Sequence, residues 1–106
     1  KDGIINTEEY SLTGKLNSKG NYKGINKEGL WEIYYLENGQ LMERKNYKNG
    51  KQDGLWESFY KNGQLKSKGE YKDGVMNGTW KFYKKDGFLF LTETWQNGVK
   101  QEFLYH

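Results

Sequence analysis

Aromatic and small residues recur along this chain at a spacing of about 25 residues. The stretch GLWESFYKNGQLKSKGEYKDG, residues 54–74, is followed by GTWKFYKKDGFLFLTETWQNG, residues 78–98, and preceded by GLWEIYYLENGQLMERKNYKNG, residues 29–50. The corresponding structural positions are Trp31, Trp56 and Trp80; Gly39, Gly63 and Gly87; Leu41, Leu65 and Leu89; and Tyr47, Tyr71 and Trp95. Such self-similarity predicts a repeat protein in which each unit packs mainly against its neighbours.

Each unit contains a hairpin signal. Asn62-Gly63 and Asp86-Gly87 are the dipeptides that two-residue type I′ turns prefer, so strands are expected on either side of them. In the second unit this turn predicts the cross-strand pairs Tyr60–Leu65, Ser58–Ser67, Trp56–Gly69 and Gly54–Tyr71. Cross-strand partners share a face of the sheet, so one face should be aromatic and small and the other mostly charged.

The first full unit has one extra residue before its glycine, which predicts a three-residue loop, Glu37-Asn38-Gly39, with Gly39 in the left-handed conformation. This loop predicts the pairs Tyr35–Leu41, Glu32–Arg44 and Gly29–Tyr47. The last unit is expected to pair Gly78 with Trp95 and Lys84 with Leu89. All three units then place Trp, Leu and Tyr or Trp on the same face.

The predicted fold is all-β: a single-layer, twisted antiparallel meander of stacked β-hairpin repeats without substantial helix. Eight or nine short strands would make a sheet about 40 Å long. We expect one repeat domain over residues 1–106. Its parts are a degenerate N-terminal repeat (1–28), full repeats (29–53, 54–77 and 78–101) and a truncated C-terminal strand (102–106).

The pattern G-x-W-x-x-[FY]-x-x-[ND]-G-x-L, followed after about ten residues by [YW]-x-[ND]-G, resembles the MORN repeat. It is more closely similar to the variant in bacterial proteins labelled YwqK-family antitoxins. The resemblance implies an elongated curved sheet and a role in interaction rather than catalysis. It implies scaffolding or lipid and membrane association as in eukaryotic relatives, and toxin neutralisation as supposed for bacterial ones.

Composition supports a thin structure. Only 34% of the 106 residues are hydrophobic, half of these are aromatic, and there is no Cys or Pro. The net charge of +3 comes from interspersed lysines and acids, which argues against a dedicated nucleic-acid surface. No apolar run approaches the length of a membrane span, and no signal peptide is visible. The compartment stays open: cytoplasmic if the protein is antitoxin-like, periplasmic or extracellular if a signal peptide precedes Lys1.

The chain offers little catalytic chemistry, and we expect a protein that is not an enzyme. Its single histidine is the last residue, it has no cysteine, and its serines lie in no nucleophile motif. No cofactor and no metal are expected. Residues 49–54 resemble a calcium loop only in part, because Lys51 stands where an oxygen ligand would be needed.

A second set of aromatic residues recurs on the face expected to be charged. Aromatic residues and methionine flanked by lysine are typical of interfaces, so this set is the predicted partner-binding surface. Its members are Tyr34, Met42, Phe59, Tyr83 and Phe90. The predicted function is a non-enzymatic protein-binding module, of antitoxin or immunity type, that acts by covering its partner. The alternative is an exported or envelope-associated protein that binds a membrane surface, lipid headgroup or glycan. Unpaired edge strands also leave an edge-to-edge homodimer open.

Overall fold

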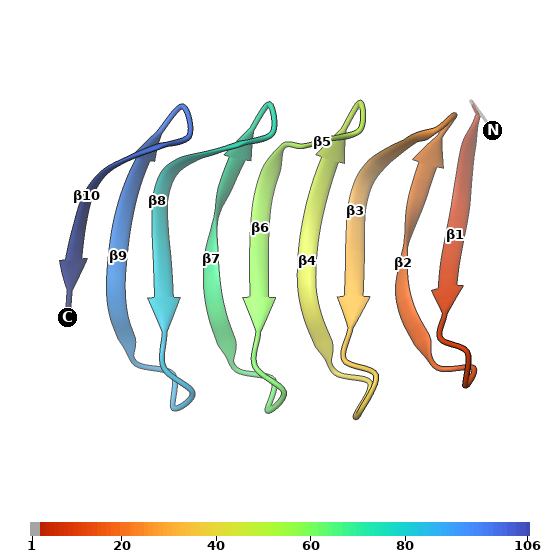
Figure 1. Cartoon of the computed structure of the whole chain (residues 1–106), viewed down its shortest axis with the longest axis horizontal. Coiled ribbons are helices and arrows are strands. Elements are labelled where there is room, and N and C mark those ends of the chain that lie inside the picture. Colours follow the sequence, from red (N-terminus) through yellow and green to blue (C-terminus); the bar gives the residue numbers. More distant parts are fainter. Residues whose placement is uncertain (1–2) are drawn as a thin grey trace.

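The computed structural model describes residues 3–106, which form one antiparallel sheet of ten strands and contain no helix (Figure 1). The strands are β1 (Ile4–Tyr10), β2 (Leu16–Lys23), β3 (Asn26–Tyr34), β4 (Leu41–Lys48), β5 (Lys51–Gln52), β6 (Gly54–Phe59), β7 (Leu65–Lys72), β8 (Val75–Tyr83), β9 (Leu89–Gln96) and β10 (Val99–Tyr105). Each strand on the path β1-β2-β3-β4-β6-β7-β8-β9-β10 pairs with the next one. The predicted all-β, single-layer meander is confirmed.

The sheet is long and thin. Its extents are 44 × 32 × 19 Å, with the longest axis running across the strands, close to the predicted length (Figure 1). The short strand β5 pairs only with β4, and the backbone N–H of Asp53 then donates to the carbonyl of Asn46 at 2.9 Å. The strand that corresponds to β3 and β8 is thus divided into β5 and β6, whereas β3 and β8 are continuous.

The register away from the long loops is as predicted. The confirmed pairs are Gly54–Tyr71, Trp56–Gly69, Ser58–Ser67, Gly29–Tyr47, Glu32–Arg44 and Gly78–Trp95. Each large aromatic residue that ends a repeat thus lies across from a glycine. In the part of the chain that the structure describes, Trp31 and Trp80 are the only buried hydrophobic residues, with 1% and 2% exposure.

The register near the long loops was predicted wrongly. Leu41 pairs with Tyr34 rather than with Tyr35, and Leu65 pairs with Phe59 rather than with Tyr60. In the same way Leu89 pairs with Tyr83 rather than with Lys84. A β-bulge in each hairpin causes the shift, because one extra residue is left out of the pairing. The three leucines therefore lie on the charged face and not on the tryptophan face.

The turn types explain these bulges. In the second repeat the N–H of Tyr60 donates to the carbonyl of Gln64, and the N–H of Gly63 donates to the carbonyl of Tyr60, both at 2.9 Å. Gly63 has φ +89°, whereas Asn62 does not have positive φ. This is a three-residue loop ending in a left-handed glycine, not the predicted two-residue type I′ turn.

The other two long loops also differ from the prediction. Lys84 and Phe88 close a three-residue loop around Asp86-Gly87. In the first repeat the N–H of Tyr35 donates to the carbonyl of Gln40 at 2.8 Å, so the loop has four residues, one more than predicted. Gly39 at its end has φ +74°, so the expected left-handed conformation of this glycine is confirmed.

Candidate protein-binding surfaces

The tryptophan face is built on two glycines. The ring of Trp31 lies directly over Gly20 of β2, and the ring of Trp80 lies over Gly69 of β7. A Cβ atom at either glycine would lie 2.1 Å from Cδ2 of the indole above it, closer than any real contact. These strands therefore need glycine so that the indoles can lie flat on the sheet and become buried.

On β4, the strand that pairs with the Trp56 strand from the N-terminal side, Lys45 stands at the position of these glycines, and Trp56 packs differently. Trp56 is half-buried, and its ring lies 5.2 Å from that of Trp80. Its indole N–H donates to Oε2 of Glu43 at 3.1 Å, whereas the indole of Trp31 donates to the carbonyl of Asn21. The repeats thus keep the tryptophan without a common partner for its N–H, and the buried Nε1 of Trp80 has no hydrogen-bond partner among residues 3–106.

Tyrosines complete this face. Tyr22 meets Trp31 edge-on at 5.2 Å, and Tyr71 meets Trp80 edge-on at 5.3 Å. Burial, followed by the charge of Glu43, raises the pKa of Tyr71 above its usual value. Because these rings contact each other across neighbouring strands, the tryptophan face serves as the packing layer of the sheet.

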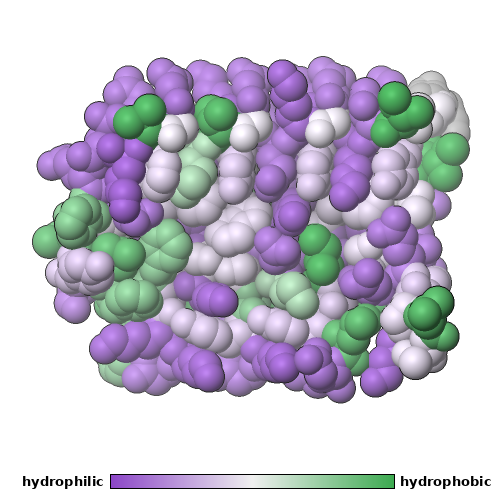
Figure 2. Space-filling model, in the orientation of Figure 1, coloured by the Kyte–Doolittle hydropathy of each residue, from purple (hydrophilic) through white to green (hydrophobic). Residues whose placement is uncertain are grey.

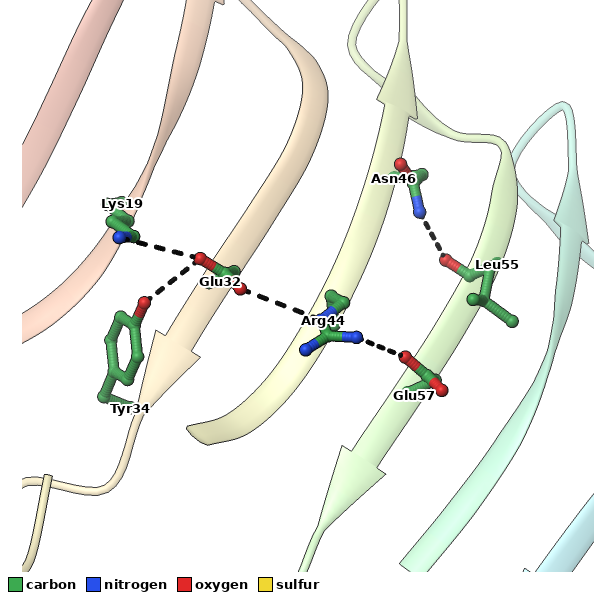
Figure 3. Close-up of polar contacts among 7 residues, drawn as sticks. All are labelled: Lys19, Glu32, Tyr34, Arg44, Asn46, Leu55 and Glu57. Carbon is green, nitrogen blue, oxygen red and sulfur yellow. Dashed lines mark hydrogen bonds and ion pairs between the residues drawn. The ribbon is translucent and has the colours of Figure 1, made fainter. Parts of the chain in front are cut away.

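The opposite face carries a chain of ion pairs across four strands (Figure 3). Lys19 Nζ lies 3.8 Å from Glu32, Arg44 Nε lies 3.7 Å from the other oxygen of Glu32, and Arg44 Nη1 lies 3.2 Å from Glu57. Tyr34 donates to Glu32 at 3.1 Å. Burial and this carboxylate raise the pKa of Tyr34. The network fixes these long side chains and keeps this band polar.

Beside this band lies a continuous row of apolar residues, which we call the Tyr–Leu row. Each strand on the path from β1 to β9 contributes one residue to this row, because the bulge of each hairpin pairs an aromatic residue with a leucine. In strand order its members are Tyr10, Leu16, Tyr34, Leu41, Phe59, Leu65, Tyr83 and Leu89. All are half-buried except Tyr10, which is exposed. No second layer of residues 3–106 covers this row.

The structure brings only some of the predicted partner-binding residues together. Tyr34, Phe59 and Tyr83 lie in the Tyr–Leu row. Met42 is unpaired at the bulge and lines a hollow of about 280 Å³ together with Phe59 of the row and Glu43 of the tryptophan face. Phe90 occupies the same bulge position in the last repeat.

Sequence reasoning missed the leucines of the row. Each repeat leucine follows its turn glycine by two residues, the place where a three-residue loop with a bulge shifts the alternation. A different choice of turn type would have found them, because moving the register by one residue changes the face of every side chain beyond it.

The comparison with protein families decides the class of the chain. The sequence model of the family described as MORN repeat variant matches residues 6–23, 27–49 and 52–73. The chain belongs to this family. The matched segments correspond to the first three hairpins, and β8 and β9 form a further hairpin beyond the matched residues. No curated protein and no solved structure matched the chain.

Two other kinds of site, metal-binding clusters and membrane-spanning helices, are absent from residues 3–106. Residues 3–106 contain no group of three or more His, Cys, Asp or Glu side chains that could hold a metal ion. No helix in this part of the chain is long and apolar enough to cross a membrane. His106 lies at the sheet edge, with Nε2 2.7 Å from Oγ1 of Thr92.

Proposed function

We propose that this MORN repeat protein is a non-enzymatic protein-binding module whose partner lies along the Tyr–Leu row. The observation that carries the proposal is the row itself: eight apolar side chains in register across one face of a single-layer sheet. A sheet with apolar residues on both faces normally needs a layer on each side. The partner would supply the missing layer.

The dimensions of the row suit a protein partner. Eight strands at about 4.8 Å spacing give a row roughly 34 Å long, enough for a standard interface of about 800 Å² on each side. Its edges are polar, since the ion pairs of Glu32, Arg44 and Glu57 run beside it. An apolar, aromatic centre with a charged rim is the usual composition of a specific interface.

The finer role that we propose is that of an antitoxin or immunity-type protein. The rigid sheet would act by occlusion, covering the active surface of its partner without any chemistry of its own. The resemblance of the repeats to those of the YwqK family supports this role. In this role the partner would be a toxin whose gene lies next to the gene of this protein. The purified protein would inhibit the purified toxin.

One observation favours the alternative of an exported or envelope-associated protein. Lys68 of β7 lies directly across from Lys81 of β8, and neither is within ion-pair distance of a carboxylate among residues 3–106. Two adjacent lysines on the face of the row would suit an anionic headgroup or glycan. Sedimentation with anionic vesicles, compared with neutral vesicles, separates this alternative from protein binding.

The experiment that tests the proposal is affinity capture from the source lysate, followed by reconstitution with the purified captured protein. We expect the double variant Phe59→Ala/Tyr83→Ala to weaken binding at least tenfold, because truncating central aromatic residues typically costs about 2 kcal/mol or more. The matched control is Phe88→Ala, which removes an aromatic side chain that is 70% exposed and lies outside the row.

Two results would contradict the proposal. If the double variant binds the reconstituted partner as tightly as the unaltered protein, the Tyr–Leu row is not the binding surface. If Phe88→Ala weakens binding equally, the effect reflects general loss of apolar surface. Circular dichroism of each variant confirms that the sheet is intact before binding is compared.

A further inference from the structure

A second hollow lies at the edge of the sheet formed by the long loops, and none of its lining residues belongs to the Tyr–Leu row. Its volume is about 580 Å³. The residues that line it come from all three full repeats and are Tyr35, Tyr60, Lys61, Asn62, Lys66 and Lys85. Its lining therefore holds three lysines and two tyrosines and no acidic residue.

The walls of this hollow are fixed by bonds between repeats. The hydroxyl of Tyr35 donates to the carbonyl of Phe59, and the hydroxyl of Tyr60 donates to the carbonyl of Tyr83, both at 2.7 Å. In each case a side chain of one repeat bonds the backbone of the next. The phenol rings are held in place before any ligand arrives, which lowers the entropic cost of binding.

The charges of the hollow are only partly compensated. Lys61 forms an ion pair with Glu37 at 3.1 Å. Lys66 has its Nζ 5.6 Å from the ring centre of Tyr60, an attractive but weak cation–π arrangement. No carboxylate among residues 3–106 lies within ion-pair distance of Lys66 or Lys85. The hollow therefore keeps a net positive charge that an anionic ligand can neutralise.

We propose that this hollow binds an acidic segment of a partner protein, with carboxylates of that segment paired to Lys66 and Lys85. Lysines offer single point charges, and the hollow has no arginine whose fork would match a phosphate in two places. The rings of Tyr35 and Tyr60 offer apolar contact to the methylene groups of glutamate side chains. Carboxylates carried on a polypeptide satisfy both features.

The test does not depend on the natural partner or on the Tyr–Leu row. A fluorescein-labelled octapeptide of alternating glutamate and alanine serves as the probe, and binding is followed by fluorescence anisotropy at low salt. We expect Lys66→Glu/Lys85→Glu to weaken binding about tenfold or more, since charge-assisted contacts are lost and repulsion replaces them. Binding should also weaken with added salt, because both lysines are exposed.

The matched control is Lys48→Glu/Lys72→Glu, which changes the net charge equally at the opposite edge of the sheet. Both residues are exposed and end strands β4 and β7. The control variant should weaken peptide binding by less than about threefold, because these two charges lie at the opposite edge of the sheet and are screened by salt.

Three outcomes would overturn the proposal. The first is absence of peptide binding, and the second is an equal loss in both double variants, which would make the effect one of net charge. The third is displacement of the peptide by inorganic phosphate as effectively as by unlabelled peptide. That last result would make the hollow a small-anion site and not a site for an acidic segment.

Discussion

Gly20 and Gly69 are glycines for reasons of space alone. Of the 14 glycines, 12 have positive φ, and these two do not. Any residue could adopt their backbone conformation, but each lies under an indole that leaves no room for a Cβ atom. The two tryptophans that have glycine beneath them are the two that are buried.

Gly69→Ala should therefore lower the free energy of unfolding strongly. The added methyl group would lie 2.1 Å from Cδ2 of Trp80, so the indole must move off the sheet. We expect a loss of about 1–3 kcal/mol or more, the usual cost of overpacking a rigid site. Urea denaturation followed by tryptophan fluorescence measures it.

Two controls isolate the contact. Lys45→Ala changes the corresponding position on β4, next to the strand of the half-buried Trp56, and should cost well under about 1 kcal/mol. In a Trp80→Ala background, Gly69→Ala should cost little, since the clashing ring is gone. An equal cost in both backgrounds would mean that the indole is not the reason for the glycine.

At the scale of the hairpin, the two edges of the sheet use different turns. The short turns Asn49-Gly50, Asp73-Gly74 and Asn97-Gly98 have positive φ at both residues, as type I′ turns require. In the long loops only the final glycine has positive φ. The same dipeptide, Asn-Gly, occurs in both kinds of turn.

This difference predicts how each edge tolerates a β-branched residue. Asp73→Val should lower stability by about 1–2 kcal/mol, because Asp73 has φ +51° and valine is strained there. Lys61→Val, in a long loop and without positive φ, should cost only a few tenths of a kcal/mol. Thermal unfolding of the two variants compares them, and similar losses would contradict the turn assignment.

The same difference explains how much of the fold and the site the sequence could predict. The repeat spacing was enough for the meander and for pairs such as Trp56–Gly69, since these depend on the periodic pattern alone. The Tyr–Leu row depends instead on where one unpaired residue sits beside each loop. An Asn-Gly dipeptide does not distinguish a two-residue turn from a three-residue loop, so Leu65 was assigned to the wrong face. The hollow around Lys66 was out of reach for a similar reason, because it brings together side chains of three repeats.

At the scale of the whole molecule, the hydrogen bonds between repeats among residues 3–106 join each repeat to its neighbours. At the long-loop edge, Tyr35 and Tyr60 bond the backbone of the following repeat. At the other edge, turn glycines bond the backbone of the preceding repeat, with Gly74 N–H donating to the carbonyl of Gln52 at 2.8 Å. A sheet held by contacts between neighbours alone behaves nearly as a one-dimensional array, in which the ends open before the middle.

Hydrogen exchange of the chain should reveal this gradient. We expect the amides of β7, which lies inside the sheet and pairs with both β6 and β8 over most of its length, to be among the most protected, and those of the edge strands β1 and β10 to exchange fastest. Every residue of β10 is exposed, so little burial slows its opening. In Gly69→Ala, protection should fall most in β6, β7 and β8 and least in β1 and β2, because the strain enters two hairpins away from that end. If protection instead falls by the same factor in every strand, the sheet opens as one cooperative unit, and the repeats do not have separable stabilities.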